Sequence, residues 1–121
     1  MNKYFIGIMT GTSADALDGC VVSFEDKFEL ICSASITLDG SYKRDYEECI
    51  RAGSKNTNES KKLFELENIL NQKTIELINL LLKKADIDIS QVSSVGFSGQ
   101  TVFHTNEKKL SNRESCIYFR T

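Results

Sequence analysis

The sequence contains no proline, has a single histidine, His104, and carries a formal net charge of only −2. Without proline, one common marker of chain boundaries is missing, so turns have to be located from glycine and small polar residues. The near-neutral charge provides neither a basic footprint for nucleic acid nor an acidic tail. We therefore expect no nucleic-acid partner, and any phosphate would have to be held by local geometry.

Metal-binding and redox patterns are also missing. The four cysteines lie far apart at Cys20, Cys32, Cys49 and Cys116, and none forms a Cys-x-x-Cys pair. Zinc sites use closely spaced ligands, so the sequence does not favour a zinc or thiol-redox protein. Cys20 and Cys32 fall within apolar runs and are interpreted as small core residues. His104 is interpreted as a surface or partly buried residue, with substrate contact as the alternative.

Long apolar runs are absent as well. No segment approaches the ~20 residues that cross a bilayer, and the opening Met1-Asn2-Lys3 leads into no signal peptide. We therefore expect a cytoplasmic protein without membrane contact, its thiols free. With 121 residues, of which 40% are hydrophobic, the chain can bury a real core. We expect a single domain over residues 1–121.

Three β-rich runs open the chain, at residues 4–9, 17–24 and 28–38. Their short polar links predict an antiparallel meander. The second run is nearly continuously apolar, which is typical of a strand covered on both faces. The third run alternates, and its pattern predicts that one set of side chains faces the core: Phe28, Leu30, Cys32, Ala34, Ile36 and Leu38.

Two helices are expected next. Residues 42–52 form a short helix closed by Gly53, and a long helix starts near Glu59 with Asn58 as its N-cap. An apolar stripe along the long helix is built mainly from Leu63, Leu66, Leu70, Leu77 and Leu81. Because the stripe is broad, packing against a sheet is favoured over a seam for a partner helix.

The last predicted strands lie at residues 92–97 and, as an option, 116–119. Polar residues 106–114 between them are expected to form a loop. The resulting order, β-β-β-α-α-β with a possible final strand, indicates an α/β fold. The chain contains no internal repeat and no low-complexity segment.

Two turns carry the possible chemistry, residues 10–13 after the first strand and residues 98–101 after the fourth. Ligands in open α/β sheets commonly sit beyond strand ends. The first turn supplies three hydroxyl groups, and Gly11 permits the backbone conformations that present N–H groups to an anion. The segment is neither a Walker A loop nor a dinucleotide fingerprint.

Two carboxylates, Asp15 and Asp18, follow the first turn and would suit Mg²⁺, which prefers oxygen ligands. The structural alternative is that both carboxylates cap backbone N–H groups of a hairpin and do nothing else. Residues 98–101 have a similar alternative as an ordinary strand-end turn. Composition alone favours the structural interpretation for both turns.

Together the two turns resemble the signatures of the anhydro-N-acetylmuramic acid kinases, bacterial enzymes of the actin-like, sugar-kinase superfamily. The family's first signature is a strand followed by Gly-x-Met-Ser-Gly-Thr-Ser-x-Asp-Gly-x-Asp, which stands here as residues 7–18. The second is Gly-x-His-Gly-Gln-Thr-x-x-His, which residues 96–104 follow except that Ser98 replaces the first His. Thr10 keeps the hydroxyl of the family's Ser, whereas Ala16 replaces a Gly and fits only with a negative φ.

The resemblance implies an incomplete N-terminal lobe of an actin-like/sugar-kinase (ribonuclease H-like) fold. It also implies that ATP phosphorylates the sugar O6 while water opens the 1,6-anhydro bridge. The product would be N-acetylmuramic acid 6-phosphate, formed in peptidoglycan recycling. Carried over by position, sugar contact falls on Gln100 and Thr101, and Asp15 would hold Mg²⁺. Nucleotide binding falls on Gly11, Thr12, Ser13, Ala14, Asp15, Ala16, Leu17 and Asp18.

The resemblance covers only the first third of a family member. The catalytic Asp base, the second phosphate loop and the adenosine pocket belong to the rest of the family pattern, so no catalytic residue is assigned here. We expect no appreciable kinase activity from this chain alone. An unfinished lobe would expose an apolar face, which predicts a homodimer or a complementing C-terminal lobe as partner. The alternative is a non-catalytic nucleotide-binding or assembly module that kept the fold.

Overall fold

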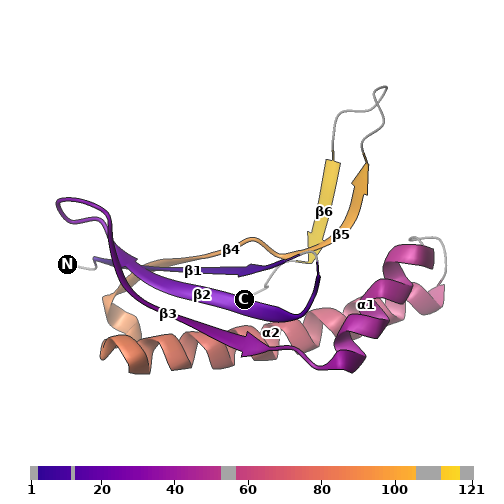
Figure 1. The fold of residues 1–121 in the computed structure, drawn as a ribbon, viewed down its shortest axis with the longest axis horizontal. Coiled ribbons are helices and arrows are strands. Elements are labelled where there is room, and N and C mark those ends of the chain that lie inside the picture. Colours follow the sequence, from indigo (N-terminus) through magenta and orange to yellow (C-terminus); the bar gives the residue numbers. More distant parts are fainter. Residues whose placement is uncertain (1–2, 12, 53–56, 106–112, 118–121) are drawn as a thin grey trace.

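The computed structural model describes residues 3–11, 13–52, 57–105 and 113–117. A four-stranded sheet lies along one long helix, with a shorter helix at one end and a separate two-stranded hairpin (Figure 1). The predicted α/β class is confirmed. The elements are β1 (Tyr4–Thr10), β2 (Ala16–Ser23), β3 (Glu29–Thr37), α1 (Gly40–Ala52), α2 (Thr57–Ala85), the 3-10 helix η1 (Ile89–Gln91), β4 (Val92–Phe97), β5 (Gln100–Thr105) and β6 (Arg113–Ile117).

The sheet has the strand order β3-β2-β1-β4. Neighbouring strands β1, β2 and β3 pair antiparallel, which confirms the predicted meander. The two helices then carry the chain across to β4, which pairs parallel with β1. Parallel neighbours end at the same edge of a sheet, so the turns that follow β1 and β4 are placed next to each other.

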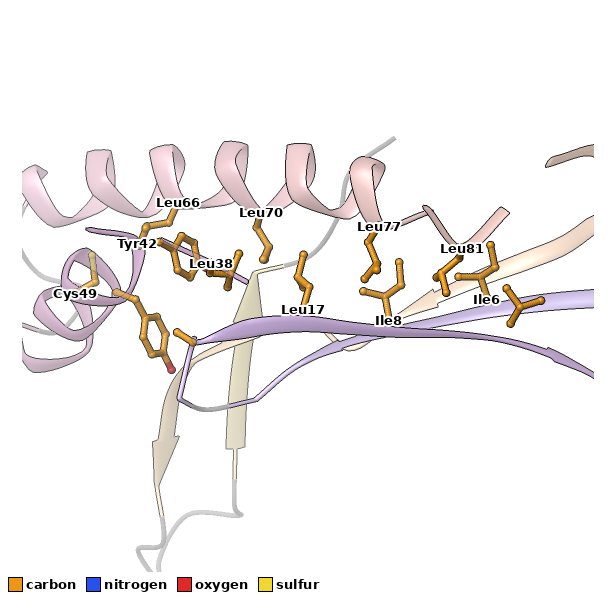
Figure 2. Packing of buried hydrophobic residues seen from close by; sticks show 13 residues of the cluster. Ile6, Ile8, Leu17, Leu38, Tyr42, Cys49, Leu66, Leu70, Leu77 and Leu81 are labelled. Atoms are coloured by element: carbon orange, nitrogen blue, oxygen red, sulfur yellow. The ribbon is translucent and has the colours of Figure 1, made fainter. Parts of the chain in front are cut away.

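The core lies between the sheet and α2, where leucines of the helix point at apolar side chains of the strands (Figure 2). Leu66, Leu70, Leu77 and Leu81 are all at most 1% exposed, which confirms that the leucine stripe packs against the sheet. Thr74, in the middle of the stripe, is also buried, and its Oγ1 donates to the Leu70 carbonyl at 2.7 Å. That bond satisfies the hydroxyl within its own helix.

The helix comes unusually close to β2 at Gly19. A Cβ atom at this position would lie 2.9 Å from Leu81 Cδ1 and 3.0 Å from Leu77 Cδ2. The absence of a side chain therefore sets how near α2 can lie to the sheet.

Two side chains of the alternating third run, Phe28 and Leu30, do not face the core as predicted. A bulge at Ile31 interrupts β3, because Val21 pairs with Cys32 while Val22 pairs with Leu30. The extra residue moves Leu30 to the face turned away from α2, where it is 56% exposed, and Phe28 is 60% exposed. The rest of the alternating set behaves as predicted, packing against the core at Cys32, Ala34, Ile36 and Leu38.

The helix ends also differ from the prediction. Helix α2 begins at Thr57, so Asn58 lies inside the helix and is not its N-cap. Gly53, the predicted cap of α1, lies outside the described residues. None of the helices among the described residues combines the length and the apolar character needed to span a membrane.

The second face of the sheet, called the outer face below, is the one turned away from α2. It carries Gly7 and Met9 of β1 and Asp18 and Cys20 of β2, by strand alternation. Within the described residues no helix covers this face, and Asp18 is exposed. The prediction that β2 is covered on both faces, with Cys20 in the core, is therefore not met in this part of the chain.

The chain after β4 differs from the predicted turn and mixed segment. Gln100 and Thr101 belong to strand β5, which pairs antiparallel with β6. The optional last strand was placed too late, since β6 covers Arg113–Ile117. Residues 118–119 lie outside the described part.

Candidate functional site

The two predicted turns meet at one edge of the sheet. Thr10, the last residue of β1, donates from its buried Oγ1 to the carbonyl of Gly99 at 2.8 Å. The backbone N–H of Ser98 donates to the carbonyl of Ile8 at 3.1 Å and so extends the pairing of β4 with β1. Gly99 has a φ of 76°, a conformation that favours glycine. Segments far apart in the sequence are thereby joined into a single site.

The first loop has a tightly turned backbone. Ala14 N–H donates to the Gly11 carbonyl at 3.3 Å, and Ala14 itself has a φ of 55° with no exposed surface. A left-handed residue other than glycine costs about 1–2 kcal/mol. Gly11 and Ser13 are exposed beside it, so the loop presents polar groups to solvent.

Ala16 satisfies the condition set by the family's glycine. The described non-glycine residues with positive φ are Ala14 and Asp86, so Ala16 is not among them, and it begins β2. Leu17 is fully buried in the core, so its side chain anchors the loop and is not available to a ligand. Thr12 lies outside the described residues.

A second backbone bond fixes the far end of the loop. The N–H of Leu38 donates to the Asp15 carbonyl at 2.8 Å, which ties the loop to the chain between β3 and α1. Helix α1 is held in turn by a buried stripe of Tyr42, Tyr46 and Cys49, spaced as one helix face. Burial raises the pKa of Tyr42, which keeps its phenol protonated. The first turn of α1 therefore has a set position against the loop.

This arrangement brings Lys43 to Asp15. The Lys43 Nζ lies 2.8 Å from Asp15 Oδ1, and both side chains remain partly exposed to solvent. The Lys43 ammonium, followed by the Ser13 hydroxyl, holds the pKa of the Asp15 carboxyl below its ordinary value. Asp15 raises the pKa of Lys43 in return. Asp15 is thus ionised across the neutral range.

Lys43 was missed by sequence reasoning. It lies 28 residues from Asp15, in a helix whose apolar stripe says only which residues are buried. Lys43 lies next to the loop because of the way α1 packs, so no pattern in the sequence could have indicated this contact.

Asp18 lies in a different environment from Asp15. It sits on the outer face of β2 opposite Met9, and its Oδ1 accepts a hydrogen bond from Ser35 Oγ at 2.7 Å. Each carboxylate thus has a partner of its own. No cluster of three or more His, Cys, Asp or Glu side chains suited to a metal occurs among the residues with described placement.

A shallow hollow of about 430 Å³ adjoins Asp18 on the outer face. It exists because Gly7 of β1 and Gly96 of β4 are direct neighbours in the sheet and neither has a side chain. Met9 and Cys20 line it as well.

The predicted sugar-contacting residues follow the joined turns directly. Gln100 and Thr101 open β5, where they pair with Ile117 and Cys116. His104 lies further along the same strand. The side chains of these three residues lie outside the described part of the structure, so only their backbone positions can be compared with the predicted roles.

Comparison with known proteins decides the family. The sequence model of the family described as Anhydro-N-acetylmuramic acid kinase matches residues 3–113. The chain belongs to this family. Its mixed four-stranded sheet with helices is consistent with an N-terminal part of a sugar-kinase lobe, and the resemblance seen in the sequence is confirmed.

Curated relatives of the same description agree. The protein named anhydro-N-acetylmuramic acid kinase from Shewanella pealeana is 35% identical over 104 residues, which cover 85% of this chain and 27% of the relative. The one from Shewanella halifaxensis is 33% identical with the same coverage. The one from Nitrosomonas europaea is 33% identical over 102 residues, 84% of this chain and 27% of the relative. The chain therefore spans about a quarter of the length of these relatives.

Proposed function

We propose that this chain provides the phosphate-binding edge of an ATP-dependent anhydro-N-acetylmuramic acid kinase. In the proposed reaction ATP phosphorylates the sugar O6 while water opens the 1,6-anhydro bridge. The product is N-acetylmuramic acid 6-phosphate, as cytoplasmic peptidoglycan recycling requires. The observation that carries the proposal is the buried bond from Thr10 to Gly99, which joins the two signature turns of the family at one sheet edge.

The nucleotide phosphates are assigned to the segment from Gly11 to Asp18. Phosphoryl transfer depends mainly on positioning and on stabilising charge, which backbone N–H groups and hydroxyls supply. Gly11 and Ser13 are exposed, and the left-handed Ala14 between them and β2 turns the backbone. Within this segment the buried Leu17 acts as an anchor only.

Magnesium is assigned to Asp15. Mg²⁺ in nucleotide sites is usually held by one or two carboxylates together with substrate phosphates and waters. A dedicated cluster of ligands is therefore not required, and an exposed, ionised carboxylate in the phosphate loop fits. When bound, the ion would neutralise charge on the phosphates.

The sugar is assigned to the start of β5. Gln100 and Thr101 come immediately after Gly99, whose carbonyl is bonded to the end of β1. Amide and hydroxyl groups suit the hydroxyls of a sugar. The proposal thus places the acceptor sugar next to the phosphate loop.

Nucleotide binding can be tested on this chain by a titration with Mg²⁺–ATP, followed through backbone amide shifts in ¹H–¹⁵N NMR spectra. We expect shifts concentrated at Gly11 and at residues 13–15, and a weaker response in Asp15→Asn. Asp26→Asn is the matched control, because Asp26 is an exposed carboxylate in the link between β2 and β3. Shifts confined to other regions, or equal responses of the two variants, would contradict the assignment.

Turnover needs the rest of the family sequence, in our proposal. We expect no phosphorylation of anhydro-N-acetylmuramic acid by the chain alone, and turnover once it is combined with the remaining segment of the Shewanella pealeana relative. Mass spectrometry of the phosphorylated sugar measures both. Turnover by the isolated chain would contradict the need for a complementing lobe. If another copy of this chain takes the place of the complementing lobe, sedimentation of the isolated chain will show a dimer.

A second candidate is a non-catalytic nucleotide-binding or assembly module. It is favoured by Ser98, an exposed residue at the position of the family's first histidine in the second signature. Under this proposal the complemented chain binds nucleotide without turnover. If Ser98→His then gains turnover in the same complemented assay, the chain has lost the reaction through this position.

A further inference from the structure

The phosphate loop carries a negative charge and no positive one. Residues 11–15 include Asp15 and contain no Lys, Arg or His. A phosphate chain brought to this loop would meet a like charge at short range, which disfavours binding unless a cation stands between them. The cation has to come from another element.

Helix α1 supplies it. The Lys43 Nζ lies 2.8 Å from Asp15 Oδ1, with side chains 41% and 59% exposed. We propose that Lys43 is the resident counter-cation of the loop, holding the Asp15 carboxylate until a divalent cation takes it and then pairing with phosphate oxygens. This inference rests on the proposed function, since it assumes that the loop receives phosphates.

The surroundings of Lys43 allow such an exchange. The helix itself is fixed by Tyr42 and Tyr46, which are 1% and 6% exposed, and the loop is fixed by the bond from Leu38 to Asp15. The ammonium group, by contrast, ends a flexible stem with three donors. Glu47, one turn further along α1, also attracts Lys43. Exposed ion pairs are weak, so partners can be exchanged at low cost between two fixed elements.

Replacing Lys43 should change the affinities for metal and for phosphate in opposite directions. In Lys43→Ala, the freed carboxylate should bind Mn²⁺ alone about two- to fivefold more tightly, in line with the strength of an exposed pair. The same variant should bind inorganic triphosphate, with chelator present, about two- to fivefold more weakly. Asp15→Asn should show the mirror image, with loss of Mn²⁺ binding and tighter triphosphate binding. Lys43→Arg should retain both affinities near those of the wild type.

The experiment uses the full chain, with Mn²⁺ binding read by electron paramagnetic resonance and triphosphate binding by amide shifts in NMR spectra. Lys62→Ala is the matched control, because Lys62 also pairs with a carboxylate, Glu48, and has a similar exposure of 37%. Circular dichroism establishes that each variant is folded. A merely structural role of Lys43 would move both affinities in the same direction, and only the counter-cation role moves them apart.

Equal affinities in wild type and Lys43→Ala, or changes of the same sign for both probes, would overturn the inference. If the wild type binds no triphosphate, the proposed function and the phosphate half of the inference fail together. The Mn²⁺ measurement still decides in that case whether Lys43 competes for Asp15. A tighter Mn²⁺ complex in Lys43→Ala supports the competition, and an unchanged one excludes it.

Discussion

The two faces of the four-stranded sheet are formed by the same strands, but one face is buried and the other is exposed. Beneath α2, Ile6 and Leu17 are 2% and 0% exposed, whereas Met9 on the outer face is 55% exposed. Strand alternation divides side chains between the faces, but only the helix makes one of them a core. The described residues therefore gain their stability from one face of the sheet. The other face and the strand ends remain available to contact other molecules.

The outer face also carries aromatic side chains, at the end away from the loop of residues 11–15. The Phe24 ring lies 5.6 Å from Phe5 and 5.4 Å from Phe28, centroid to centroid. Contacts between aromatic rings in these orientations are favourable, beyond what the burial of the rings contributes. Phe24 and Phe28 remain 56% and 60% exposed, so this end of the face is apolar without being covered by the described residues.

The largest difference between the faces should appear on truncation of a core leucine. Leu77→Ala removes a fully buried side chain and should lower the free energy of unfolding by about 2–5 kcal/mol. Met9→Ala on the outer face should change it by no more than about 0.5 kcal/mol. Urea denaturation measures both. Similar losses in the two variants would mean that both faces are buried in solution.

Added volume should discriminate between the faces in the same way. Gly19→Ala places a methyl group 2.9 Å from Leu81 Cδ1 and should destabilise by about 1–3 kcal/mol through overpacking. Gly7→Ala meets only Cys20 Sγ at 3.7 Å on the outer face, an ordinary contact. Thermal unfolding of the two variants tests this, and a loss in Gly7→Ala as large as in Gly19→Ala would refute it.

At the strand ends, the bond between the signature turns should be weaker than the core but stronger than outer-face bonds. Thr10→Val keeps the shape and removes the donor to the buried Gly99 carbonyl, which should cost about 1 kcal/mol. Ser35→Ala removes an exposed hydroxyl bonded to Asp18 and should cost less. Urea denaturation ranks the two, and the reverse order would mean that the turns are not joined through Thr10 in solution.

The smallest effect is expected from the Lys43–Asp15 pair, and this effect should vary with pH only at the extremes of pH. Because the pKa of Asp15 is lowered from 3.8, its contribution is present above that pH and is lost as pH falls through the folded value. Because the pKa of Lys43 is raised from 10.5, its contribution is present below that pH and is lost as pH rises through the folded value. The Tm difference between wild type and Lys43→Gln should therefore be constant near neutrality and shrink below pH 3.8. A difference that varies between pH 6 and 8 would point to another titrating group.

Much of the fold follows from short-range patterns. The alternation in β3 and the leucine stripe of α2 repeat at the periods of a strand and a helix, so each segment indicates its own structure. The two signature turns likewise stand out by composition, since glycine and hydroxyl residues directly follow apolar strands. These features need no knowledge of what lies across the sheet.

The bulge at Ile31 shows where such patterns stop. In the sequence, apolar residues alternate regularly from Leu30 to Leu38, but the pairing register of β3 against β2 shifts by one residue. Pairing depends on two strands together, and a shift of one residue exchanges the faces of every side chain beyond it. The pattern in a single strand cannot record that shift.

The sequence by itself determined the class of the fold, the family and the positions of the two turns, because these reside in local periods and short motifs. Only the tertiary structure decided that the turns touch, through Thr10 and Gly99, and that Lys43 faces Asp15. Those contacts join residues 89 and 28 positions apart. They arise from the parallel pairing of β4 with β1 and from the packing of α1, and such long-range contacts leave no periodic trace in the chain.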